Sequence, residues 1–246
     1  MTSSRSATTL AIVLIVAGVA ATIGGLYGQI FLGEDEGHHD GRDFTFARTA
    51  QVGADELVVT ADGPNRVRAE VLRAGQAIGV DDVHGGGTHF FVVAQDLSYV
   101  AHTVADQPSA VLDAPAGRVR VIAQVAPSGG DDFVELGADV VVGGDEIASP
   151  VIVDDDEWSD GGVVVRRQFL DFVLDETWNG EPVFEGPAFL TLYAGEDLAF
   201  VHAHGEVVDP RRFSFDVNLP GLGEYLAALE FEQDGELVTA LFRFTL

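Results

Sequence analysis

Short alternation of apolar and polar residues over most of the sequence limits the chain to β-strands with one buried and one solvated face. Val119 and Val121 alternate with Arg118 and Arg120, and apolar residues occupy every second position from Phe213 to residue 219. Turn residues separate such runs at the spacing that is typical of sandwiches. No long pattern with a period of 3.6 residues follows residue 33, so the sequence predicts an all-β fold for the remainder.

The chain also resembles itself, which predicts two similar domains. Residues 89–102 (HFFVVAQDLSYVAH) are similar to residues 189–204 (FLTLYAGEDLAFVHAH), and residues 115–125 are similar to residues 220–231. In each half a turn and a final strand follow. The repeat therefore predicts two tandem Ig-like antiparallel β-sandwich domains of about 100 residues each, over residues 44–145 and 146–246.

Acidic segments flank these domains. Residues 33–43 lack periodicity and are predicted to form an acidic linker, in which His38 and His39 either catch a divalent cation or are incidental. The run Asp154–Glu157 lies at the boundary between the domains. It either binds Ca²⁺ or forms a solvated loop, and it lacks the fixed ligand spacing of a calcium loop.

One uncharged segment precedes the linker and is predicted to anchor the chain in a membrane. Residues 10–32 are apolar over a length that spans the hydrocarbon core as a helix. Arg5 precedes this segment and Glu34 follows it, so residues 1–8 are predicted to be cytoplasmic, residues 9–32 transmembrane, and the rest extracytoplasmic. The predicted location is the cell membrane, with a single pass.

Two alternatives concern this segment. It could be a signal peptide cleaved after Ala20, because small residues at positions 18 and 20 suit a peptidase; the apolar stretch continues well past that position, which favours the anchor. Gly24 and Gly28 form a GxxxG pair that either brings two helices together or arises by chance in a Gly-rich helix. The oligomeric state stays open.

Charge and composition exclude several classes of protein. The chain carries 40 acidic residues against 13 basic ones, all arginine, for a net charge of -27. Because phosphate binding requires clustered Lys and Arg, nucleic acid is excluded as a partner. A lysine-free acidic surface suits concentrated salt, which screens self-repulsion, and indicates a halophilic source or an Arg-rich, GC-biased genome. The absence of cysteine excludes disulfides and thiolate metal sites.

Four of the seven histidines lie in the repeated hairpins and are the candidate site. If the first hairpin turns at residues 95–98, His89 lies opposite Val104 and His102 is its diagonal neighbour on the same face. His202 and His204 are two residues apart on one strand and also share a face. Neutral imidazoles bind Cu(II) and Zn²⁺, so the cofactor is either a copper or zinc ion held by these four residues, or none.

The alternative for these histidines is a structural one. Leu198 and Phe200 have the same parity as His202 and His204, so the four histidines could be partly buried, hydrogen-bonded strand residues at a domain end. His84, beside the glycines at 85–87, is either a supporting ligand or part of a plain loop.

The histidine pattern resembles a known group of proteins. A His-Leu-x-Val-Val segment, then Asp-Leu, then His-x-His, once in each of two β-sandwich repeats behind an export or anchor segment, is similar to mostly uncharacterised exported prokaryotic proteins. Some members are associated with heavy-metal handling. The resemblance covers roughly residues 85–246 and implies the tandem sandwich and the four histidines as metal ligands. Val104 and Phe189 depart from the pattern, each standing where a histidine would be.

No catalytic motif is present: GxSxG, HExxH, the P-loop and the Rossmann glycines are all absent from the sequence. The chain is therefore predicted not to be an enzyme. The expected function is that of a membrane-anchored extracytoplasmic binding module for a divalent transition metal. The alternative is a structural or protein-interaction module of the cell envelope, with an envelope protein as its partner and no metal.

Overall fold

The computed structural model describes residues 42–43, 49–80, 87–128, 134–145, 147–148, 150–176, 188–195, 198–219, 221–233 and 235–246. All regular secondary structure in these ranges is β, as the alternation predicts. None of the described residues forms a helix that is long and apolar enough to cross a membrane. The predicted anchor at residues 9–32 lies outside the described residues, as do His38, His39 and His84.

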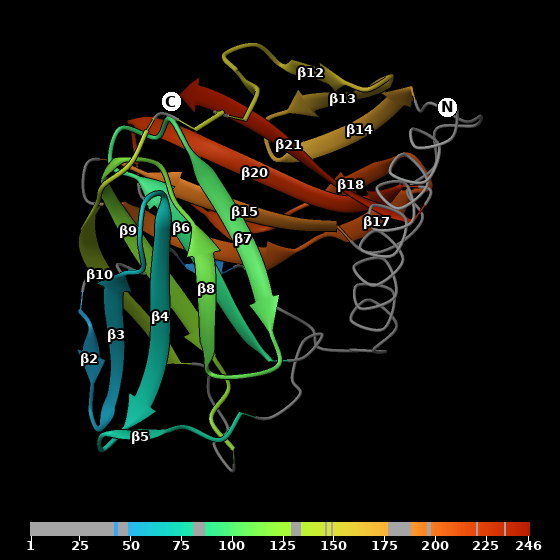
Figure 1. Ribbon diagram of the computed structural model, residues 1–246. Coiled ribbons are helices and arrows are strands. Elements are labelled where there is room, and N and C mark those ends of the chain that lie inside the picture. The colour runs from blue at the N-terminus through green and yellow to red at the C-terminus, as the bar shows by residue number, and fades with distance from the viewer. Residues whose placement is uncertain are drawn as a thin grey trace, which may run out of the picture.

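The first half of the chain forms two sheets (Figure 1). One contains β2 (Gln51–Val52), β3 (Asp55–Ala61), β4 (Arg66–Arg73) and β5 (Gln76–Ala77) in that order, and β8 (Ser109–Asp113) also pairs with β4. The other has the order β10-β9-β6-β7, formed by β6 (Thr88–Ala94), β7 (Val100–Ala105), β9 (Gly117–Val125) and β10 (Val134–Val142).

The second half also forms two sheets. The order β12-β13-β14-β18-β17 consists of β12 (Glu157–Asp160), β13 (Val163–Gln168), β14 (Asp171–Glu176), β17 (Glu206–Asp209) and β18 (Arg212–Ser214). The order β11-β21-β20-β15-β16 consists of β11 (Ile152–Val153), β15 (Ala188–Ala194), β16 (Ala199–His204), β20 (Glu224–Gln233) and β21 (Glu236–Thr245). Two short strands, β1 (Arg42–Asp43) and β19 (Val217–Asn218), pair in parallel.

The two halves repeat one pattern of strand pairing. In the first half β4 pairs with β3 and β8, while β6 pairs with β7 and β9. In the second half β14 pairs with β13 and β18, while β15 pairs with β16 and β20. In each half the chain thus crosses more than once between the two sheets, which is the arrangement of an Ig-like sandwich. The repeat seen in the sequence is a repeat of topology.

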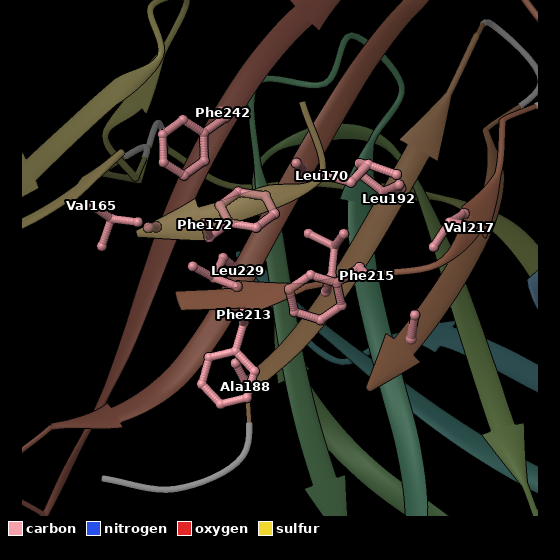
Figure 2. Packing of buried hydrophobic residues seen from close by; sticks show 14 of the residues in the cluster. Val165, Leu170, Phe172, Ala188, Leu192, Phe213, Phe215, Val217, Leu229 and Phe242 are labelled. Atoms are coloured by element: carbon pink, nitrogen blue, oxygen red, sulfur yellow. The ribbon is translucent and has the colours of Figure 1, made fainter. Parts of the chain in front are cut away.

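Each half has its own hydrophobic core between its two sheets. The first is centred on residues such as Val67, Phe90 and Val121, all fully buried. The second is richer in aromatic residues, and Figure 2 shows Phe172, Phe213 and other side chains from both of its sheets filling the space between them. Burial of these inward-facing residues supplies most of the driving force for folding, at roughly 25 cal/mol per Å² of apolar surface.

A third buried cluster joins the two halves. Phe91, Val93, Leu97, Val100 and Ile122 of the first half pack with Tyr193, Leu198, Phe200, Leu226, Ala228 and Leu241 of the second half. These residues come from the outer faces of sheets β10-β9-β6-β7 and β11-β21-β20-β15-β16. The two sandwiches therefore stack face to face through equivalent sheets.

This stacking corrects the expectation that every strand has one wet face. All seven residues of β6 are buried, and so are all seven of β15, because these strands have a core on both sides. Gln124, expected on a solvated face, is only 4% exposed. The alternating run at residues 212–219 is also divided between β18 and β19, because residues 215 and 216 belong to neither strand.

Candidate functional site

The hairpins β6–β7 and β15–β16 place the four predicted histidines on the two stacked sheets. His89 lies opposite Val104, as predicted from the position of the turn, and His102 lies opposite Phe91. In the second half Phe189 lies opposite His204, and Thr191 lies opposite His202. Each half thus contributes one histidine from the middle of its hairpin and a second from nearer the open end.

The strand register shows which positions of the two repeats are equivalent. His102 matches His202, because each lies across from the middle residue of a central strand. His89 matches Phe189. The sequence alone left this alignment ambiguous because the turns are shifted by one residue: the leucine with a positive φ is Leu97 in one hairpin and Leu198 in the other.

The side chains of His89, His102 and Glu230 are linked by two short polar contacts, one of which joins the two sandwiches. The Nδ1 atom of His89 lies 3.0 Å from Nε2 of His102. The Nδ1 atom of His102 lies 2.6 Å from Oε2 of Glu230, which belongs to strand β20 of the second half. His102 therefore uses both ring nitrogens and joins the two domains.

The direction of these hydrogen bonds follows from the groups involved. An ionised Glu230 can only accept, so His102 donates through Nδ1–H. In a neutral His102 ring Nε2 is then an acceptor, and His89 donates to it through its own Nδ1–H. Glu230 is 4% exposed and the His102 side chain 12% exposed. A buried carboxylate costs several kcal/mol unless it is paired and hydrogen-bonded, so His102 is central to keeping Glu230 between the sheets.

His202 completes a group of three histidine rings from both halves. The ring centroids of His89, His102 and His202 are 5.1, 5.5 and 5.4 Å apart in the three pairings. Nδ1 of His202 lies 2.9 Å from the Thr191 hydroxyl. Phe91 packs among these rings, stacked on His102 at 4.4 Å between centroids. The structure therefore gathers three of the predicted histidines into one buried cluster, here called the histidine cluster (His89, His102 and His202).

His204 lies at the margin of this cluster. Its ring is 5.8 Å from that of His202 and 4.7 Å from that of Phe189, in edge-on orientation in both cases. The residue is only partly buried. Among the described residues, no group of three or more His, Asp or Glu side chains is arranged to hold a metal ion as the rings now stand.

A cleft of about 430 Å³ adjoins the histidine cluster. Tyr99 and residues 100–102 of β7 form one wall, and residues of β15, β20 and β21 form the other. Ala148 and Pro150 of the interdomain segment complete the cleft. Its polar lining includes His102 and Glu230. Burial raises the pKa of Tyr193, which also lines the cleft, well above its ordinary value, and the carboxylate of Glu230 raises it further.

The acidic interdomain run pairs with arginines. Asp156 forms an ion pair with Arg167, and Glu157 lies 2.8 Å from Arg166. Asp154 is 80% exposed and lies 3.9 Å from Arg243. These three carboxylates are directed to three different arginines of the second half, of which Arg167 is buried.

Sequence reasoning missed Glu230 as a site residue. Forty carboxylates offer no way to single one out by composition. A usable signal was nonetheless present, because Glu230 is the one charged residue in the apolar run from Tyr225 to Phe231. A lone carboxylate in a strand buried on both faces marks a polar group that needs a partner.

Comparisons with known proteins add only distant likenesses. No family model matches the sequence, and no curated protein matches it. Similar solved structures include the FN1–FN3 domains of chicken CNTN1, with 10% identity over 79% of this chain and 68% of that one and a TM-score of 0.26. A two-domain fibronectin type-III segment of chicken tenascin has 11% identity, coverage of 76% and 96%, and a TM-score of 0.25. TM-scores this low carry no argument, so the description of the sandwiches depends on the strand pairing.

Proposed function

We propose that this protein is an extracytoplasmic binding module, held at the membrane by residues 9–32, that captures a divalent transition metal at the histidine cluster. The observation that carries this proposal is the meeting of His89 and His102 with His202, which come from opposite halves of the chain. The ion would be Cu(II) or Zn²⁺, because neutral imidazole is a good ligand for both.

The spacing of the rings suits a shared ion. Two imidazoles that bind Zn²⁺ in a tetrahedral site, with nitrogens about 2.0–2.1 Å from the metal, have centroids roughly 5 Å apart. The three centroid distances of 5.1, 5.5 and 5.4 Å are close to this value. Since Nε2 of His102 already accepts a hydrogen bond from His89, the His89 ring must turn, or its Nδ1 proton must move to Nε2, before all three histidines can bind one ion.

Glu230 would then support the site. A carboxylate that accepts a hydrogen bond from the second nitrogen of a metal-bound histidine fixes the ring and makes it a better ligand. The 2.6 Å contact from Nδ1 of His102 has that form and leaves Nε2 of His102 as the atom that faces a metal. The net charge of -27 would raise the local concentration of cations around the molecule.

A second function is favoured by the hydrogen bonds as they stand. His89, His102 and Glu230 are already hydrogen-bonded to one another, and the contact between His102 and Glu230 connects the two sandwiches. A module that holds two sandwiches at a fixed angle for an envelope protein partner needs no metal. The two functions make opposite predictions for a metal titration.

Calorimetric titration of the full-length chain, purified at high salt in detergent, with Cu(II) and with Zn²⁺ tests the metal proposal. Saturable binding near one ion per chain, weakened at least about tenfold in His202→Ala and in His102→Ala, is expected. The control is a double variant, His38→Ala with His39→Ala, in the acidic linker. If the linker variant loses binding while His202→Ala retains it, or if wild type does not bind, the histidine cluster is not a metal site.

A further inference from the structure

A buried carboxylate lies in the wall of the cleft beside the histidine cluster. Glu230 is 4% exposed and contacts His102, the other ionisable group with which it shares a described hydrogen bond. That contact is made through Oε2, and the same carboxylate lines the cleft, in a place from which water is largely removed. Such a charge is costly, and a cation that reaches it from the cleft would be bound strongly.

The rest of the lining favours an organic cation over a metal ion. Val100, Leu237 and Leu241 give the cleft an apolar surface, which a hydrated metal ion would not cover. Among its described lining residues there is one carboxylate, Glu230, and no arginine, which favours a cation over an anion. A volume of about 430 Å³ lies within the usual range for small-molecule sites, roughly 300–1,000 Å³.

Hydroxyl groups around Glu230 supply further acceptors. Thr191 and Thr239 both line the cleft. The Tyr193 hydroxyl is fully buried there, and no described residue forms a hydrogen bond with it. A primary ammonium group has three N–H donors, and one carboxylate with two or three hydroxyls matches that number.

We propose that this cleft binds a small organic cation, a primary ammonium group on an apolar chain, with the ammonium at Glu230 and the chain against Val100 and Leu241. This function goes beyond metal capture: the cleft shares His102 with the histidine cluster, but His89 and His202 are not among its described lining residues. The negative charge of the whole molecule would steer such a cation toward the site.

Titration of the full-length chain with n-hexylammonium, followed by calorimetry and by the shift in Tm, tests this assignment. We expect saturable binding of one ligand per chain, and weaker binding of the neutral analogue n-hexanol. Glu230→Gln keeps the shape of the side chain and removes its charge, and should weaken binding at least about tenfold. Glu236→Gln, an exposed carboxylate on β21 outside the cleft, is the matched control and should bind like wild type.

Two further variants keep the test decisive. Thr239→Phe leaves Glu230 unchanged and fills the cleft from β21, where residue 239 is partly buried and pairs with Glu230, so it should abolish binding even if Glu230→Gln folds poorly. His202→Ala should lose metal and keep hexylammonium, which separates this site from the metal site. Binding that survives Thr239→Phe, equal affinity for tetramethylammonium, or no saturable binding to wild type would overturn the proposal.

Discussion

His102 and Glu230 are 128 residues apart in the chain, and Nδ1 of His102 lies 2.6 Å from Oε2 of Glu230. Each residue belongs to the sheet of its sandwich that faces the other sandwich. The contact lies beside a cluster in which Phe91 and Phe200 pack at 5.1 Å between centroids. A polar pair is thus enclosed in an otherwise apolar interface. Such a pair adds directional specificity, because it is satisfied only when the two sheets meet in one register.

Removing one partner of this pair should be more costly than removing both. His102→Ala would leave the Glu230 carboxylate buried without its donor, and we expect the free energy of unfolding to fall by about 3–5 kcal/mol. Adding Glu230→Gln to that variant should recover part of the loss. Denaturant titrations of wild type, both single variants and the double variant measure the coupling. Additive effects would mean that the two residues do not interact.

The apolar interface should make the two sandwiches unfold together. Phe91→Ala removes a fully buried ring between them and should cost about 3–5 kcal/mol. It should also divide a single calorimetric transition into two, because the cluster that couples the halves is weakened. Phe172→Ala, in the core of the second sandwich alone, is the control. Two transitions in wild type would show that the interface does not couple the domains.

Gly205 follows His204 directly, and its lack of a side chain is required by close packing. A Cβ at this position would lie 2.7 Å from Cδ1 of Phe213 and 2.8 Å from Cζ of Phe215. Gly205→Ala should therefore lower the free energy of unfolding by about 1–3 kcal/mol. Gly223→Ala, where a Cβ would meet nothing within 4 Å, should leave stability nearly unchanged. Equal effects in thermal unfolding would contradict the packing argument.

Asp139 gives a stability effect with a defined dependence on pH. Burial opposes ionisation of Asp139, but hydrogen bonds from Arg120 and Arg118 outweigh it, so the pKa of Asp139 is below its ordinary value. A lowered folded-state pKa stabilises the protein above the unfolded value of about 3.9, and this contribution disappears as pH falls through the folded pKa.

Asp139→Asn should accordingly be less stable than wild type near neutral pH, and the difference should vanish in acid. Because the Asp139 side chain is 29% exposed, the effect should be below about 1 kcal/mol. Thermal unfolding of both proteins over a pH series measures it. A difference that grows toward acid pH would have the wrong sign.

The sequence carried enough information for the strands and the hairpin register of the site. Alternation and turn residues predicted the all-β fold, and the turn near Asp96 placed His89 opposite Val104. The alternation of apolar and polar residues could not show what packs against the outer face of each sheet. Ile122 and Gln124 are buried because a second sandwich lies against them, and alternation within one strand does not report a partner more than 60 residues away.

The same limit explains the outcome for the candidate site. Sharing a face along one strand could be inferred for His202 and His204, yet the structure draws His202 toward His89 and His102 and leaves His204 at the margin. Glu230 escaped notice because its importance arises from burial and from one long-range contact. Both are properties of the packed pair of domains.

The use of equivalent faces by both halves has a consequence for how the two sandwiches find each other. A single repeat would expose the face that carries Phe91 or Phe200 and would need another copy to cover it. Two separate chains would have to find each other by diffusion, at a rate set by their concentration. Joining them through the short segment between β10 and β11 turns that encounter into an intramolecular one, so each half covers the apolar face of the other at any protein concentration.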